Sequence, residues 1–170
     1  HNNGPKNQKP IVLVGKAVTF DTGGISLKPG QSMDEMKFDK CGGCTVLGIM
    51  KSVSELKLPI NVVGIIPSVE NMPGGEAYRP GDILKLYNGK TAEILNTDAE
   101  GRLILADALA YGEKQYSPKA IIDFATLTGA CIVALGNNVA AIVSNNEQLT
   151  KKITDSSKTT TEEIWELPLT

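Results

Sequence analysis

The chain has 170 residues, of which 41% are hydrophobic and 21% charged, a composition that fits one soluble globular domain and excludes disordered, collagen-like and low-complexity proteins. Its 17 Lys and Arg residues against 19 Asp and Glu residues give a net charge of -2, so nucleic acid is not an expected partner. No apolar run reaches the roughly 18 residues of a membrane span, and the N-terminus lacks a secretory signal pattern. We therefore expect a soluble cytoplasmic protein without a membrane partner.

Histidine chemistry is excluded from the interior of the chain. The single histidine, His1, lies in a polar stretch, residues 1–10, which we expect to be a flexible leader. Ser-His-Asp sites, Cys-His sites and HExxH zinc proteases are therefore ruled out. Cys41 and Cys44 have CxxC spacing, but no second CxxC exists to complete a zinc site, and we interpret them as small buried residues near a tight turn.

The predicted elements of the first half alternate between short apolar runs and amphipathic segments. Residues 11–14 form a continuous apolar run and predict a buried strand, and residues 46–56 carry apolar side chains at helical spacing. Residues 61–68 predict a second buried strand. An Asn-Gly pair between β-prone runs predicts a hairpin over 83–95.

The second half continues the same alternation. Residues 103–111 have a helical pattern, 120–125 predict another buried strand, and 126–130 form the loop that closes it. Residues 147–158 predict a polar surface helix, and the tail around Trp165 shows no clear pattern. This order predicts an α/β fold with a mixed, mostly parallel sheet flanked by helices.

The segment 15–28 directly follows the first predicted strand and carries Lys16, Asp21 and Lys28 around a Gly-Gly pair. Adjacent glycines let the backbone approach a ligand closely, and ligands bind at the carboxyl ends of strands in open sheets. A loop with solvated charges explains the same residues equally well. Both interpretations remain open on this segment alone.

Two further acidic clusters each allow a structural and a functional interpretation. Asp39 stands before a predicted helix and suits a helix N-cap. Thr97 and Glu100 fit a capping box, although a glycine and an arginine directly after Glu100 are unfavourable in a first helical turn. An extended Asp98-x-Glu100 would instead direct both carboxylates to one side, as a metal site needs.

Taken together, the stretches VGKAVTFDTGGISLKPG, MDEMKFDKCGG and NTDAEGRLILADALAY resemble the catalytic domain of the leucine (cytosol) aminopeptidase family. ENMPGG and ATLTGA are also similar to family segments, and the resemblance covers nearly the whole chain. It implies that residues 1–170 are part of one metallo-aminopeptidase catalytic domain. An N-terminal domain and a C-terminal remainder of the catalytic domain would lie outside the chain, and the full-length parent would be a homo-hexamer.

The resemblance also implies a set of site residues. The metal ligands would be Lys16, Asp21, Asp39, Asp98 and Glu100. The catalytic pair would be Lys28, which stabilises the oxyanion, and Arg102, which holds a bicarbonate. The substrate site would be lined by Met36, Asn96, Thr126, Leu127 and Gly129. The cofactors would be two divalent ions, zinc or manganese, with magnesium also possible at one site.

The implied activity is a metal-dependent exopeptidase that releases leucine and similar residues from peptides with a free N-terminus, by attack of a metal-bridging hydroxide. Four carboxylates carry enough negative charge to hold two dications, whereas Lys16 must lose its proton to act as a ligand. Two alternatives remain: a fragment without activity of its own, and a family member with a DNA-binding regulatory role. The net charge disfavours the second.

Overall fold

The computed structural model describes residues 1–169, and the chain divides into two compact units, His1–Leu127 and the segment from Thr128 onward. The sequence predicts one domain, and membership of both units in one catalytic domain stays a prediction. The helices and strands of the first unit are β1 (Ile11–Gly15), β2 (Ala17–Asp21), η1 (Met33–Phe38), α1 (Cys41–Glu55), β3 (Val62–Ile65), β4 (Ser68–Asn71), β5 (Ile83–Lys85), β6 (Thr91–Glu93), η2 (Thr97–Ala99), α2 (Glu100–Tyr116) and β7 (Ala120–Phe124).

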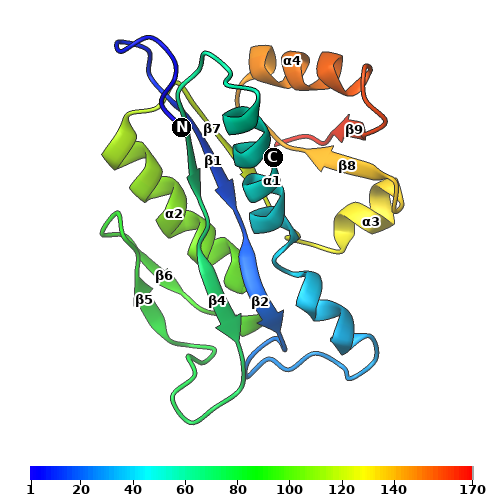
Figure 1. The fold of residues 1–170 in the computed structure, drawn as a ribbon. Helices are drawn as coiled ribbons and strands as arrows, with labels where there is room; N and C mark the ends of the chain where they lie inside the picture. The colour runs from blue at the N-terminus through cyan, green and yellow to red at the C-terminus, as the bar shows by residue number, and fades with distance from the viewer. Residues whose placement is uncertain (170) are drawn as a thin grey trace. The chain divides into compact units, whose positions relative to one another are not determined.

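The centre of the first unit is a parallel three-stranded sheet in the order β3-β1-β7, with α1 and α2 on opposite faces (Figure 1). Successive residues of a strand point to opposite faces. Val12 and Val14 of β1 accordingly pack against Leu105 of α2, whereas Leu13 packs against Val46 of α1. Burial on both faces explains the continuous apolar run of β1. The predicted α/β class with mostly parallel pairing is confirmed.

Helix α1 approaches the sheet closely through two buried glycines. The Gly43 N–H donates a 2.7 Å hydrogen bond to the carbonyl of Lys16, and a Cβ on Gly42 would collide with the carbonyl of Phe124. The CxxC spacing therefore encloses two positions that require glycine. The prediction that Cys41 and Cys44 are buried was wrong, because the two glycines face the sheet and both free thiols are exposed. Where a tight turn was expected, the chain forms the first turn of α1. The helix therefore begins earlier than the predicted range 46–56.

Two smaller pairings complete the strands of this unit. β2 pairs with β4 in parallel, and β5 pairs with β6 as the predicted antiparallel hairpin. The prediction of one strand over 61–68 was wrong, because β3 ends at Ile65 and β4 begins at Ser68. The Pro67 between them has no N–H, and the chain changes partner there from β1 to β2. The segment 15–28 is not a loop throughout, because it contains the strand β2.

The second unit contains α3 (Ala130–Leu135), β8 (Val139–Ile142), α4 (Glu147–Ser157) and β9 (Glu163–Glu166). The polar helix predicted over 147–158 is confirmed as α4, and the side chain of Asn146 accepts a 3.0 Å hydrogen bond from the Leu149 N–H at its start. The tail around Trp165, for which the sequence showed no pattern, forms β9 and pairs in parallel with β8. The expected loop 126–130 contains the first residue of α3.

The leader 1–10 makes contacts with the region before β3. The Asn61 side chain donates to the carbonyls of Pro5 and Gln8, and the His1 carbonyl accepts from the Val62 N–H. The flexibility expected for this leader stays a prediction. Within the described part of the chain, no helix combines the length and apolar character that a membrane crossing requires.

Candidate functional site

Lys16 lies between β1 and β2 and is held in place through its backbone. Its N–H donates 2.9 Å to the Phe124 carbonyl, and its carbonyl accepts from Gly43. The side chain is almost fully buried, and its Nζ lies 2.9 Å from Asp39 Oδ1 and 2.8 Å from Glu100 Oε1. One buried lysine thus brings together carboxylates from two segments that are far apart in the sequence.

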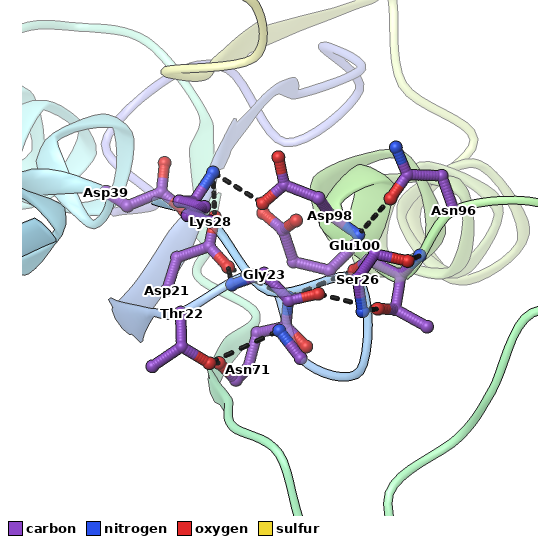
Figure 2. A network of polar contacts seen from close by, with 12 residues as sticks. Asp21, Thr22, Gly23, Ser26, Lys28, Asp39, Asn71, Asn96, Asp98 and Glu100 are labelled. Atoms are coloured by element: carbon purple, nitrogen blue, oxygen red, sulfur yellow. Dashed lines mark hydrogen bonds and ion pairs between the residues drawn. The ribbon is translucent and has the colours of Figure 1, made fainter. Parts of the chain in front are cut away.

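Lys28 makes the second pair of ionic contacts, on the loop that follows β2. Its Nζ lies 3.1 Å from Asp21 Oδ2 and 2.5 Å from Asp98 Oδ1 (Figure 2). Burial lowers the pKa of Lys28, but its hydrogen bonds and ion pairs with Asp98 and Asp21 outweigh that effect and leave the pKa raised. Lys28 therefore keeps its positive charge at neutral pH.

The carboxylates of Asp21, Asp98 and Glu100 converge, each offering an oxygen within 4.8 Å of the others. Burial raises the pKa of Glu100, and the contact with Lys16 offsets this only in part. Two buried carboxylate oxygens, Asp39 Oδ2 and Glu100 Oε2, accept no hydrogen bond from any residue in 1–169. Two more, Asp98 Oδ1 and Glu100 Oε1, are contacted only by a lysine.

Buried oxygens of this kind are costly unless a cation or donor satisfies them. Carboxylate oxygens are also the ligands that hard divalent cations prefer. The residues present therefore fit a divalent metal centre.

The prediction of an extended Asp98-x-Glu100 was wrong. Asp98 lies in η2, and Glu100 is the first residue of α2. The capping-box alternative was wrong as well, because Asn96 accepts the 2.9 Å hydrogen bond from the Asp98 N–H, while Thr97 Oγ1 donates to the carbonyl of Gly23. The tight turn from η2 into α2 brings both carboxylates to the same site.

Gly101 makes room for Lys16 at the start of α2. A Cβ at this position would lie 2.8 Å from Lys16 Cε and 3.0 Å from Leu127 Cδ1. Glycine lowers helix stability relative to alanine by about 1 kcal/mol, which was the argument against a helix here. The close approach of the lysine explains why the glycine is present and why the helix forms nonetheless.

Asp39 is not the N-cap of α1, contrary to the structural alternative. It terminates η1, and Lys40 occupies the N-cap position. Its Oδ1 accepts a 2.6 Å hydrogen bond from Thr126 Oγ1, and the Thr126 carbonyl accepts one of 3.0 Å from Lys16 Nζ. Thr126, expected in the substrate site, thus joins the cluster through both side chain and backbone.

The other expected site residues are less closely tied to these carboxylates. Met36 is half-buried in η1, and its carbonyl accepts from the Asp39 N–H. Arg102 is exposed on α2 and makes no side-chain hydrogen bond or ion pair within residues 1–169. Gly129 belongs to the second unit, where it precedes α3. The structure brings together Lys16, Asp21, Lys28, Asp39, Asp98, Glu100 and Thr126.

Two polar residues beside the cluster were not predicted. The Asn71 side chain, at the end of β4, donates 2.8 Å to Asp21 Oδ1 and 3.0 Å to the Thr97 carbonyl. The Tyr78 hydroxyl donates 2.8 Å to the same carbonyl. Burial first, and the negative charges of the site carboxylates second, raise the pKa of Tyr78 to about 12. Asn71 and Tyr78 lie on either side of a Pro- and Gly-rich loop. No pattern in the sequence indicated that their side chains donate hydrogen bonds to the residues of the site.

The family model described as "Cytosol aminopeptidase family, catalytic domain" matches residues 1–170. The chain belongs to the cytosol aminopeptidase family. A relative named "Probable cytosol aminopeptidase" from Cenarchaeum symbiosum is 76% identical over 169 residues, which are 99% of this chain and 35% of that protein. One of the same name from Methylobacillus flagellatus is 57% identical over 99% of this chain and 34% of its own length.

Among solved structures, the cytosol aminopeptidase of Coxiella burnetii matches with a TM-score of 0.91 and 44% sequence identity. The match covers 97% of this chain and 36% of that one. The chain thus spans about a third of the length of the cytosol aminopeptidases that it matches.

Proposed function

We propose that this chain supplies the metal-binding part of an aminopeptidase that removes leucine and similar residues from the N-terminus of peptides. The observation that carries the proposal is the convergence of three carboxylates within 4.8 Å, next to a buried lysine that contacts a fourth. Membership of the cytosol aminopeptidase family supports the same activity. The family resemblance further leads us to propose a cytoplasmic homo-hexamer.

The proposed ligands of two divalent ions, zinc or manganese with magnesium possible at one site, are Lys16, Asp21, Asp39, Asp98 and Glu100. When bound, the two ions would supply Lewis acidity and activate a water, as hydroxide, for attack on the peptide carbonyl. Asp39 Oδ2 and Glu100 Oε2, which accept no hydrogen bond within residues 1–169, provide lone pairs for this purpose. Lys16 can act as a ligand only after losing its proton, so metal affinity should fall as the pH is lowered.

Lys28 has the properties needed to stabilise the developing oxyanion. Its side chain is 23% exposed, so it is accessible at the site, and its raised pKa keeps it charged. Arg102, exposed in the first turn of α2, is proposed to hold a bicarbonate that moves a proton during the reaction. The proposed substrate contacts are Met36, Asn96, Thr126, Leu127 and Gly129.

The activity is tested on the whole protein with a leucyl amide as substrate. Hydrolysis should stop when a chelator removes the divalent ions and should return when zinc or manganese is added. Hydrolysis of a peptide with a blocked N-terminus should stay negligible throughout. Hydrolysis that continues at full rate in verified metal-free protein would contradict the proposal.

The proposed role of Lys28 is tested by Lys28→Ala, with metal content measured alongside. Loss of one oxyanion donor is expected to lower kcat by about 10²–10³-fold while the protein keeps its metal. Arg102→Ala should cost less, because water can replace bicarbonate in moving the proton. Unchanged kcat in metal-loaded Lys28→Ala would remove this lysine from the mechanism.

A further inference from the structure

Asn71 contacts two of the segments that carry the proposed ligands. Its side chain is 3% exposed, and its Nδ2 donates 2.8 Å to Asp21 Oδ1 and 3.0 Å to the Thr97 carbonyl. Asp21 ends β2, whereas Thr97 directly precedes Asp98. One buried amide therefore links the two ligand segments directly.

The contact also distinguishes the two oxygens of Asp21. Oδ1 accepts from Asn71 Nδ2 and, at 2.9 Å, from the Gly23 N–H, whereas Oδ2 is directed to Lys28 at 3.1 Å (Figure 2). Two donors on Oδ1 leave Oδ2 as the oxygen available to a cation. The orientation of a ligating carboxylate is commonly set by hydrogen bonds of this kind.

A second set of contacts joins the same segments. The Ser26 N–H donates 2.8 Å to Thr97 Oγ1, and the Thr97 N–H donates 3.1 Å to Ser26 Oγ. Thr97 Oγ1 also donates 2.6 Å to the Gly23 carbonyl, and the Thr97 side chain is fully buried. These contacts fix the loop that carries Lys28 against η2, so Asn71 acts within an ordered framework.

We infer that Asn71 is a positioning residue for the metal centre: it orients Asp21 so that Oδ2 faces the site, and it holds Asp21 in register with Asp98 and Glu100. This inference rests on the proposed function, because it concerns the ligands named there. It assigns Asn71 no contact with the substrate or with the reacting atoms.

Loss of the Asn71 side chain can be separated from loss of the fold. The backbone carbonyl of Asn71 accepts from both the N–H and Oγ1 of Thr22, at 2.9 Å and 2.8 Å. These bonds join the end of β2 to the end of β4, and they remain in any substitution at position 71. Asn71→Ala should therefore keep the strand pairing.

The chain offers a matched control in Asn61. It is also buried, at 8% exposure, and its Nδ2 also donates two hydrogen bonds to the protein, 3.1 Å to the Pro5 carbonyl and 2.9 Å to the Gln8 carbonyl. None of its partners is a proposed ligand. Asn61→Ala thus removes a comparable buried amide without touching the site.

The test measures Mn²⁺ affinity of the metal-stripped whole protein by calorimetry, together with Tm. Asn71→Ala should bind Mn²⁺ about 10–100-fold more weakly than wild type, a range typical of residues that orient metal ligands. Asn61→Ala should bind with wild-type affinity, whatever its Tm. Asn71→Asp has the size of asparagine but, when ionised, cannot donate to Asp21, so it should lose at least as much affinity as Asn71→Ala.

Three outcomes would overturn the inference. They are wild-type Mn²⁺ affinity in Asn71→Ala, an equal loss in Asn61→Ala, or full retention of affinity in Asn71→Asp. Should Asn71→Ala fail to fold, Asn71→Asp and Asn71→Ser provide the same comparison. If wild-type protein itself binds no Mn²⁺ or Zn²⁺, the proposed function fails together with the inference, whereas normal wild-type binding with no effect at position 71 defeats the inference alone.

Discussion

Tyr78 shows how the acidic cluster affects a neighbouring residue that carries no charge at neutral pH. Its hydroxyl donates to the Thr97 carbonyl, and burial together with Glu100, Asp21 and Asp98 raises its pKa from 10.0 to about 12. Ionisation would end the donation and add a negative charge beside three carboxylates. The neutral phenol is therefore the form that the folded protein stabilises.

A pH titration of metal-free protein should detect this tyrosine. Because the folded-state pKa is raised, the stability it contributes is fully present below pH 10 and is lost as the pH rises through about 12. Tyrosinate absorbance should show one tyrosine ionising later than an ordinary tyrosine, with circular dichroism followed in parallel to detect unfolding. Tyr78→Phe should remove that late step, and a late step that persists would contradict the assignment.

Lys16 illustrates a role that depends on several distant positions at once. Its side chain fits only because residue 101 is glycine, and its backbone is held by Gly43 and Phe124. A buried lysine without counter-charges would be unstable in its charged form. The contacts with Asp39 and Glu100 supply those charges.

At the level of the element, the position of α1 depends on its first turn. A side chain at Gly42 would collide with the Phe124 carbonyl, whereas a Cβ at Gly48, in the same helix, would meet no atom within 4 Å. The two glycines thus differ in surroundings and share a helix. Because Asp39 lies directly before this helix, the docking of α1 also affects the proposed metal site.

We expect Gly42→Ala to destabilise the fold by about 1–3 kcal/mol, the usual cost of overpacking, and to weaken metal binding through displacement of Asp39. Gly48→Ala should instead stabilise the fold by about 0.5–1 kcal/mol, because alanine favours a helix interior. Urea denaturation of both variants measures the difference. Equal stability of the two variants would show that the contact with β7 does not constrain α1.

At the scale of the whole molecule, the 170-residue chain exposes large apolar side chains. Within the first unit, Leu95 is 79% exposed, Ile83 69% and Leu27 61%. Exposed apolar side chains promote association when they lie together in large patches. The chain also spans only about a third of the relatives that it matches, so residues that cover such side chains there can lie outside it.

We predict that the isolated 170-residue chain self-associates and has little leucyl-amide hydrolase activity even with zinc or manganese added. Sedimentation velocity measures its association, and the amide assay measures its activity at matched concentration. The whole protein serves as the positive control for the assay. A monodisperse, fully active monomer would contradict the prediction.

Local pattern in the sequence was sufficient for the elements whose residues follow a regular spacing. The apolar runs of β1 and β7, the hairpin β5–β6 and the polar helix α4 were all predicted, because each depends on spacing within a few residues. β2 and β9 were missed. Their pairing depends on partners 51 residues away for Ala17 and 24 residues away for Val139, which no local pattern reveals.

Residue types and motifs are enough to define the chemistry available to this protein: carboxylates and lysines, no internal histidine, and three stretches that resemble one family. The folded chain is needed to show which oxygen of Asp21 faces the site, why residue 101 must be glycine, and that Asn71 joins the ligand segments. The physical reason is that these properties are distances between groups far apart in the chain. Residue type fixes what a side chain can donate or accept, whereas packing fixes where it does so.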